Sequence, residues 1–334
     1  MPKRIVATLS ILGLIASGLF SLSWGIWGHQ HINRAAVFAL PDSMRVFFFN
    51  HIDYLTEEAA VPDLRKYLIG DRAEPDRHYI DLEAFGPHPF EVLPRSWDAA
   101  VQKYGEEKLH QAGILPWYIQ DMEKKLEQAF RNRRVDEILF IAADLGHYIG
   151  DAHVPLHTTI NHDGQLTGQR GIHAFWESQL PEMFGANYNF HVSPAKYIPD
   201  IQGEVWQIIR HSHSLVDSVL VIEKRLKASF PQDELYRRDA AGQIIKNKYG
   251  QPVYTYAFAK AYHEALHGMV EDQMRRAIQE LADFWYTAWV NAGRPDLTTL
   301  DDPSLTQANQ KIFKKAYRLW QQGKLWGIRS GSEY

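Results

Sequence analysis

Apolar residues recur at three- and four-residue spacings along most of this chain, and no stretch alternates apolar and polar residues between turn signals. The first pattern is typical of α-helices that bury one face, whereas the second would indicate strands. We therefore expect one all-α domain built from many helices. The helical spacing occurs in seven stretches, residues 28–40, 97–111, 115–132, 135–153, 204–230, 254–293 and 304–323.

Proline and glycine gather at residues 85–95, 161–171 and 240–252, which we expect to be loops. The last of these is a candidate hairpin or another extended excursion from the helices. The chain has 334 residues, of which 45% are hydrophobic, enough for one large core or two small ones. The absence of any repeat or low-complexity tract favours a single domain.

The first 23 residues have the organisation of a secretory signal peptide. Two cations at positions 3 and 4 precede an apolar run over residues 5–20, and serines occupy positions 21 and 23. The run is shorter than the ~20 residues that span a bilayer. We expect cleavage between Ser23 and Trp24, which would leave residues 24–334 as a secreted or periplasmic protein without a transmembrane anchor. Retention of the leader as an anchor is the alternative.

The chain contains no cysteine, which excludes disulfides and thiolate metal sites. Any transition-metal site must therefore use imidazoles and carboxylates, and sixteen histidines supply ample imidazoles. The net charge of −4 gives no bulk attraction for polyanions, so an anionic substrate would need a local positive field.

The densest group of candidate ligands is the segment LGHYIGDAHVPLH, residues 145–157. His147 and Asp151 are four residues apart, so a helix projects both from one face. Pro155 interrupts that helix, and His157 follows the break, where the chain can return its imidazole to the same pocket. His153 lies on another helical face, and we expect it to be a bystander.

Three further pairs complete the pattern. Each pair alone would more often be a surface contact or a helix cap, and only their combination and order point to metal binding. The pairs are His173 with Glu177, again four residues apart, Asp63 with His78 on either side of a loop, and Trp24 with His29 at the expected start of the mature chain.

The combined pattern resembles the zinc-dependent phospholipase C and P1/S1 nuclease superfamily over residues 24–177. The similar segments are WGIWGH, a Pro-Asp pair followed by HYID, HYIGDAHVPLH and HAFWE. The resemblance implies a multi-helical domain with three zinc ions at the bottom of a cleft and a mature chain that begins with tryptophan. The implied activity is hydrolysis of a phosphodiester by a zinc-bound hydroxide, with no stable protein partner. Residues 190–260 match no motif and would border the cleft.

The same resemblance implies a ligand set. Zinc accepts imidazole nitrogen and carboxylate oxygen, and it readily displaces the proton of an α-amine whose pKa is ~8. That amine exists only after the leader is removed. One zinc ion would be held by Asp63, His78, His147 and Asp151, a second by His157, His173 and Glu177, and a third by the amine and carbonyl of Trp24, by His29 and by a shared oxygen of Asp151.

Candidate catalytic residues lie beside Asp63 and His78 in the sequence. The resemblance implies that Asp63 orients or deprotonates the attacking water, and Lys66 or Arg65 can reach the phosphate. Tyr79 and Asp81 match residues that stack on and hydrogen-bond to a base in nuclease relatives. Because phospholipase relatives also carry an aromatic residue there, a phospholipid headgroup and single-stranded nucleic acid both stay open as substrates.

Two other functions fit part of the sequence. The segment HEALH matches the HEXXH signature of zinc metalloproteases, with His263 and His267 as ligands, Glu264 as base, and Glu271 or Glu280 as a third ligand. The ligands could instead form a structural zinc core in a non-catalytic exported binding protein. Structural zinc sites normally have four protein ligands, whereas the set of His157, His173 and Glu177 has three.

Overall fold

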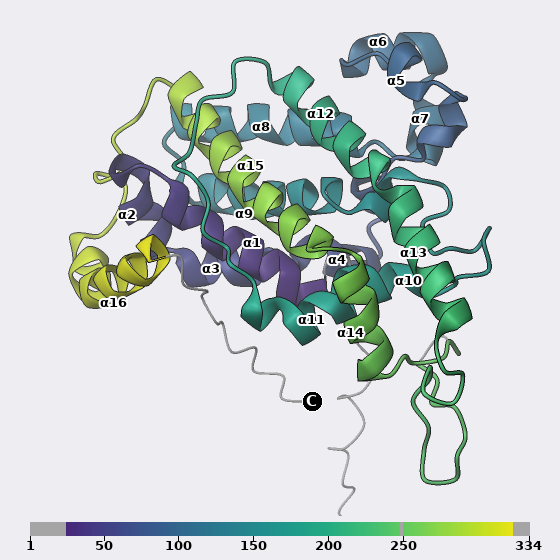
Figure 1. Cartoon of the computed structure of the whole chain (residues 1–334). Coiled ribbons are helices and arrows are strands. Elements are labelled where there is room, and N and C mark those ends of the chain that lie inside the picture. The colour runs from purple at the N-terminus through teal and green to yellow at the C-terminus, as the bar shows by residue number, and fades with distance from the viewer. Residues whose placement is uncertain (1–24, 248–249, 323–334) are drawn as a thin grey trace, which may run out of the picture.

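The computed structural model describes residues 25–247 and 250–322 (Figure 1). Helices dominate this part of the chain and no β-strand forms within it, which confirms the all-α class. The α-helices are α1 (Gly25–Ala39), α2 (Asp42–Asn50), α3 (Ile52–Glu58), α4 (Val61–Leu64), α5 (Pro89–Val92), α6 (Trp97–Tyr104), α7 (Glu106–Ala112), α8 (Leu115–Arg131), α9 (Val135–Ala152), α10 (Ile172–Ala174), α11 (Leu180–Phe184), α12 (Ile201–Ser214), α13 (Val216–Ser229), α14 (Tyr256–Ala265), α15 (Met269–Asn291) and α16 (Pro303–Gln321).

Shorter turns connect these helices near the site described below. Two of them, η1 (Arg65–Ile69) and η5 (Phe175–Gln179), are π-helical, a rare geometry that often occurs at functional sites. The others are 3₁₀ turns, namely η2 (Pro75–His78), η3 (Leu82–Phe85), η4 (Pro155–Thr158) and η6 (Gly185–Asn187).

Three of the expected helices are divided in two. Residues 97–111 form α6 and α7, separated by Gly105 with a φ of 78°. Residues 254–293 form α14 and α15, because His267 and Gly268 have φ values of 50° and 83° and so leave the right-handed helical region. Residues 204–230 form α12 and α13, which meet at Leu215. Residues 42–58 were not expected to be helical, because the unbroken run Val-Phe-Phe-Phe at 46–49 hides any helical period.

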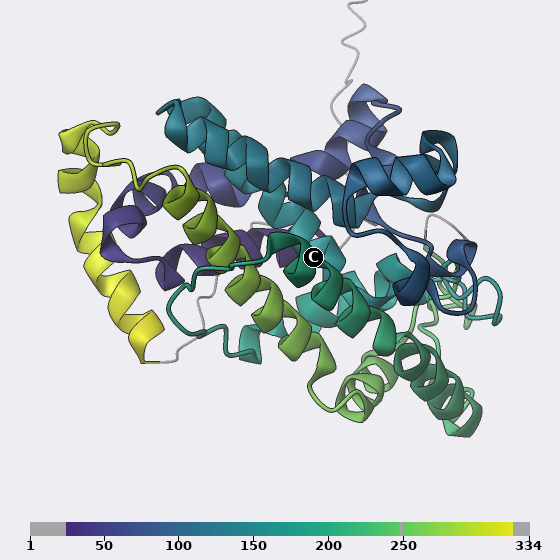
Figure 2. The same cartoon turned by 90° about the horizontal axis from the view of Figure 1, so that it is seen from above.

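Helix α9 lies at the centre of the molecule and packs against α1, α3, α8 and α15 (Figures 1 and 2). Nearly every residue of its second half is buried, which suits a helix enclosed on all sides. The core around it contains large aromatic side chains such as Tyr148, Trp176 and Trp285, all fully buried.

Two glycines of α9 allow α1 to approach closely. A Cβ atom at Gly146 would lie 1.9 Å from Oδ1 of Asn33, and one at Gly150 would lie 3.0 Å from Nδ1 of His29. The amide of Asn33 donates hydrogen bonds of 3.0 Å to the carbonyls of Leu55 and Ala143, so it joins α1 to both α3 and α9. This contact fixes the first turns of α1 against the second half of α9.

The three expected loops are only partly irregular. Residues 85–95 include the single turn of α5, and residues 161–171 contain no helix. The third loop belongs to an extended excursion held by isolated antiparallel bridges, which confirms the expectation for that stretch. The bridges pair Tyr236 with Tyr254, Arg238 with Ile244, and Lys246 with Pro252. Within the described residues, no helix has the length and apolar character needed to cross a membrane.

Candidate metal centre

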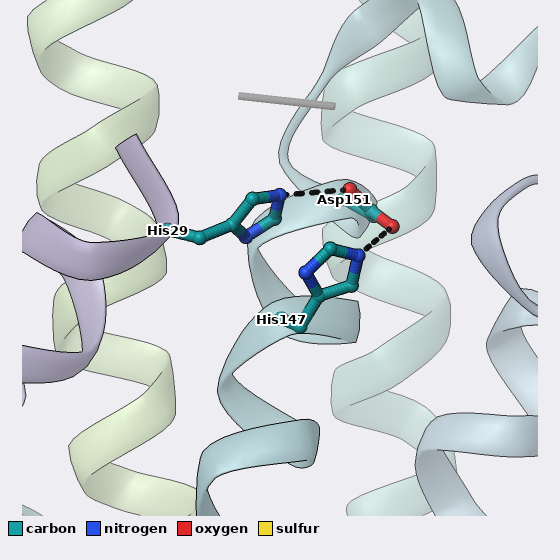
Figure 3. Close-up of side chains that lie close together, drawn as sticks. All are labelled: His29, His147 and Asp151. Atoms are coloured by element: carbon teal, nitrogen blue, oxygen red, sulfur yellow. Dashed lines mark ion pairs between the residues drawn. The ribbon is translucent and has the colours of Figure 1, made fainter. Parts of the chain in front are cut away.

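The C-terminal half of α9 carries two side chains of the first group of candidate ligands. His147 and Asp151 project from one face of α9, as their spacing predicts, and His29 faces them from α1 (Figure 3). Nε2 of His147 lies 3.3 Å from Oδ2 of Asp151, and Nε2 of His29 lies 3.5 Å from Oδ1. The two imidazole rings stack with their centroids 3.8 Å apart. All three side chains are completely buried.

A second group shares His147 and Asp151 with the first. Asp63 comes from α4 and His78 from η2, and both face His147. Oδ1 of Asp63 lies 3.7 Å from Nδ1 of His78 and 3.9 Å from Nε2 of His147. Nδ1 of His78 also lies 2.8 Å from Oδ2 of Asp151. One carboxylate, Asp151, therefore serves both groups with its two oxygens.

The third group lies beyond the break in α9. Pro155 begins η4, which carries His157, while α10 and η5 carry His173 and Glu177. Nε2 of His173 lies 3.0 Å from Oε1 of Glu177, and Nε2 of His157 lies 3.3 Å from Oε2. His157 also connects this group to the first, because its Nδ1 lies 4.0 Å from Oδ1 of Asp151.

An acceptor outside the cluster contacts one ring nitrogen of four of these histidines. The nitrogen on the other side of each ring faces the cluster, an orientation that is characteristic of metal-binding imidazoles. The outer contacts are His147 Nδ1 with the carbonyl of Ala59 at 2.8 Å, His173 Nδ1 with the carbonyl of His162 at 2.9 Å, His78 Nε2 with Oε1 of Glu74 at 3.2 Å, and His157 Nδ1 with the carbonyl of His78.

Several polar atoms at the centre have no hydrogen-bond partner among the described residues. They include both ring nitrogens of His29 and Oδ2 of Asp63, the oxygen on the other side from Lys66. Leaving a buried polar atom unpaired costs ~1–3 kcal/mol. Nε2 of His147 and Nδ1 of His78, which both face the cluster, lie 3.1 Å apart. Bound cations would satisfy these converging nitrogen and oxygen atoms, so the residues fit a metal centre.

The electrostatics of His29, Asp151 and Glu177 favour the forms that bind a metal, whereas the neighbouring carboxylates raise the pKa values of His147 and His173 against the effect of burial, so a metal would displace a proton there. Burial lowers the pKa of His29 to about 4, and the charge of His147 acts in the same direction. Burial alone would raise the pKa of Asp151, but the surrounding imidazoles, His147 first, hold it well below its usual range. Burial likewise disfavours ionised Glu177, yet His173 and His157 lower its pKa to about 2. At neutral pH His29 is therefore neutral and both carboxylates are ionised.

A cavity of about 770 Å³ opens onto part of this cluster. His78, His157, His173 and Glu177 line it, whereas the remaining described ligands are buried beneath. The third group is therefore the one that most directly faces the cavity, and it has only three protein ligands.

The candidate substrate-binding residues Tyr79 and Asp81 also line the cavity. Burial, followed by the charge of Glu83, raises the pKa of Asp81 to about 6. The structure thus places both side chains beside the ligand groups.

The two candidate phosphate-binding cations have different surroundings. Lys66 lines the cavity, and its Nζ lies 2.6 Å from Oδ1 of Asp63. Arg65 instead donates to both carboxylate oxygens of Asp144 at 2.6 Å, and it does not line the cavity. Of the two cations, only Lys66 is placed to contact a substrate.

A set of residues that the sequence pattern did not single out supports the second group. Glu74 is completely buried and accepts hydrogen bonds from His78 and from the hydroxyl of Tyr148. Arg65 and Arg77 lie 3.5 and 2.9 Å from Oε2 of Glu74. The four-residue spacing of Glu74 and His78 was a visible signal, but it resembles an ordinary surface pair.

The HEALH segment has a different geometry from a metalloprotease site. Helix α14 ends at Ala265, so the backbone of His267, with its φ of 50°, is outside the helix that carries His263. Nε2 of His263 lies 2.6 Å from the hydroxyl of Tyr188, and Glu264 is paired with Lys260 at 3.7 Å. In residues 25–247 and 250–322, no group of potential metal ligands includes either histidine, and none includes His153.

Eight of the nine expected ligand positions lie in three neighbouring groups of the structure. The ninth, Trp24, and the expected leader, residues 1–23, lie outside the described residues, and α1 begins at the next residue, Gly25. No family model and no curated protein matches the chain.

Proposed function

We propose that this protein is an exported zinc-dependent phosphodiesterase of the phospholipase C or P1/S1 nuclease type, with its active site in the cavity above the ligand cluster. The observation that carries the proposal is the set of three linked His/carboxylate groups, of which one faces the cavity directly. The absence of cysteine and the mixture of nitrogen and oxygen donors suit zinc. Three ions would occupy the site, with the amine of Trp24 completing the ligands around His29.

The proposed hydrolysis needs a metal to stabilise charge, a base for the attacking water and side chains that contact the substrate. Zinc would polarise the phosphoryl oxygens and stabilise the charge that develops on the attacking and leaving oxygens. Asp63 accepts the proton of the attacking water at a carboxylate oxygen, and Oδ2, the oxygen that Lys66 does not contact, is placed for this. Lys66, 2.6 Å from that carboxylate, neutralises charge on the phosphoryl group. Tyr79 and Asp81 contact the part of the substrate beyond the phosphate.

An open coordination position separates this proposal from a structural zinc core. Structural zinc sites are normally closed by four protein ligands. The group of His157, His173 and Glu177 has three and lines the cavity, so a substrate oxygen can reach a metal held there. The same cavity admits either a phospholipid headgroup or a nucleotide, and side-by-side turnover of phosphatidylcholine, single-stranded DNA, RNA and a 3′-nucleotide decides between them.

The decisive experiment uses two histidine variants of the mature chain, residues 24–334, loaded with zinc. We expect His147→Ala to lose bound zinc and at least 100-fold in hydrolysis of a chromogenic phosphodiester, because His147 belongs to two ligand groups. The matched variant His263→Ala should keep both, since His263 contacts Tyr188 instead. Circular dichroism confirms that each variant is folded.

The other possible results identify the other functions. Peptide hydrolysis that is lost in His263→Ala and kept in His147→Ala would establish the metalloprotease. Zinc bound without turnover of any of the four substrates or of the chromogenic diester would establish the non-catalytic binding protein.

A further inference from the structure

Helix α16 is attached to the protein by one face only. Its buried side chains are Ala316 and Trp320, and the ring of Trp320 lies 6.4 Å from that of Phe38. Tyr317 lies beneath the guanidinium of Arg45, at 4.0 Å from the ring centroid. Figures 1 and 2 show α16 at the edge of the molecule, where it packs on α2. Phe313 packs on Phe49 on the same face, and the opposite face of α16 is exposed.

An exposed apolar stripe borders the attached face of α16. Leu305 and Ile312 are two full turns apart on one side of α16, with exposed fractions of 38% and 62%. A residue of this type is normally buried when it belongs to a helix face that packs on its own core. Here Leu305 and Ile312 lie along the margin of the attached face, at about 60° and 80° around the helix from Trp320, and both stay exposed.

A basic stripe runs beside the apolar one. Lys311, Lys315 and Arg318 are spaced by four and three residues, so they lie on one side of α16, and Lys314 flanks them. All four are exposed, and within the described residues none has a carboxylate partner.

Helix α16 is positively charged, whereas the chain as a whole has a net negative charge. Residues 303–322 contain these four cations and no acidic residue, although the whole chain has a net charge of −4. The nearest acids in sequence are engaged elsewhere, because Asp301 contacts His51 at 2.8 Å and Asp302 caps the backbone of Ser304. The outer surface of α16 is thus a local positive field next to exposed aliphatic side chains.

We propose that the outer surface of α16 docks this protein on an anionic lipid bilayer. Anionic headgroups attract exposed lysine and arginine side chains, and the aliphatic side chains beside them enter the boundary between headgroups and acyl chains. A nucleic acid would use the cations and leave Leu305 and Ile312 in water. A second copy of this chain docked through the same surface would bring like charges together, which opposes association.

The proposal is tested by sedimentation of the protein with vesicles, using phosphatidylcholine alone and a mixture with phosphatidylglycerol. We expect binding to the mixed vesicles only, and release of the protein as sodium chloride is raised from about 0.05 to 0.5 M. Each cation near an anionic surface contributes ~1 kcal/mol, or about fivefold in affinity. The variant Lys311→Gln, Lys314→Gln, Lys315→Gln, Arg318→Gln should therefore bind up to a thousandfold more weakly, and Ile312→Ser should bind several-fold more weakly.

A matched control removes the same charge from other exposed helices. Lys124→Gln, Lys125→Gln, Lys224→Gln, Arg225→Gln changes three lysines and one arginine on α8 and α13, and it should bind mixed vesicles as the unchanged protein does. Equal binding by the two fourfold variants would overturn the proposal, as would equal binding to both kinds of vesicle. Binding of a single-stranded oligonucleotide that is lost in the fourfold α16 variant while vesicle binding is kept, or self-association that is lost in Ile312→Ser, would overturn it in favour of a different partner. Thermal unfolding confirms that both fourfold variants are folded, and no outcome depends on hydrolytic activity.

Discussion

The substitution Gly146→Ala tests how α1 is held against α9. The new Cβ would lie 1.9 Å from Oδ1 and 2.7 Å from Cγ of Asn33, and 2.8 Å from Cδ2 of Leu281. Asn33 cannot move away without breaking its two 3.0 Å hydrogen bonds to the carbonyls of Leu55 and Ala143. The alanine therefore pushes α1 away from α9 or removes both hydrogen bonds.

The expected loss of stability combines two destabilising effects and one stabilising effect. Overpacking a core costs typically ~1–3 kcal/mol, and each lost hydrogen bond costs about 1 kcal/mol. Alanine in place of glycine within a helix returns about 1 kcal/mol. We expect Gly146→Ala to lower the free energy of unfolding by ~2–4 kcal/mol. Urea unfolding should show this as a lower midpoint with an unchanged slope.

Gly150→Ala provides the matched control on the same helix face. Its Cβ meets only His29 at 3.0 Å and Ile32 at 3.4 Å, so the helix-propensity gain should offset most of the strain and leave stability within ~1 kcal/mol of the original. Adding Asn33→Ala to Gly146→Ala removes the clashing amide, and the pair should be less destabilising than the sum of the two single changes. If Gly146→Ala proved as stable as Gly150→Ala, the close approach of α1 to α9 would be refuted.

Two further predictions concern carboxylates, of which Glu74 is completely buried and Glu280 partly buried. Glu74→Gln should weaken zinc binding ~10–100-fold, because it weakens the outer hydrogen bond to His78. Competition with a chelator measures this loss. Asp71 lies near Arg77 and not near His78, so the control Asp71→Asn should leave zinc binding unchanged. Burial, then the charge of Glu204, raises the pKa of Glu280 to about 8, so the folded state keeps a proton that the unfolded state releases near pH 4.5. The free energy of unfolding should therefore fall as pH rises from about 4.5 to 8, by ~1.4 kcal/mol per pH unit at most. Urea unfolding of the unchanged protein and of Glu280→Gln measures this, because the difference between their free energies of unfolding should follow the same slope. A difference that does not change with pH would contradict the prediction.

The local pattern of α9 was enough to predict the core of the candidate site. The spacing of His147 and Asp151 fixes them on one helix face, and Pro155 fixes the turn that returns His157 to the same region. The remaining ligands come from distant segments, so their position followed from the family resemblance and not from spacing. Their convergence in the structure agrees with that expectation.

Other features depend on long-range contacts that a sequence does not display. Arg65 and Lys66 are adjacent and chemically alike, yet the position of Asp144 on a neighbouring helix draws Arg65 away from the cavity. The breaks at Gly105 and at His267 depend on backbone angles that apolar periodicity does not report. Helix α2 was missed because its phenylalanines contact the core on several sides, which removes the periodic signal.

The most direct test of a trinuclear centre is the number of zinc ions per chain, counted by emission spectroscopy after exchange into metal-free buffer. We expect three ions in the chain that begins at Trp24, and two in a chain that keeps residues 1–23, because the leader holds the nitrogen of Trp24 in a peptide bond. A count below one in the mature chain, or the same count in both forms, would contradict the proposed centre.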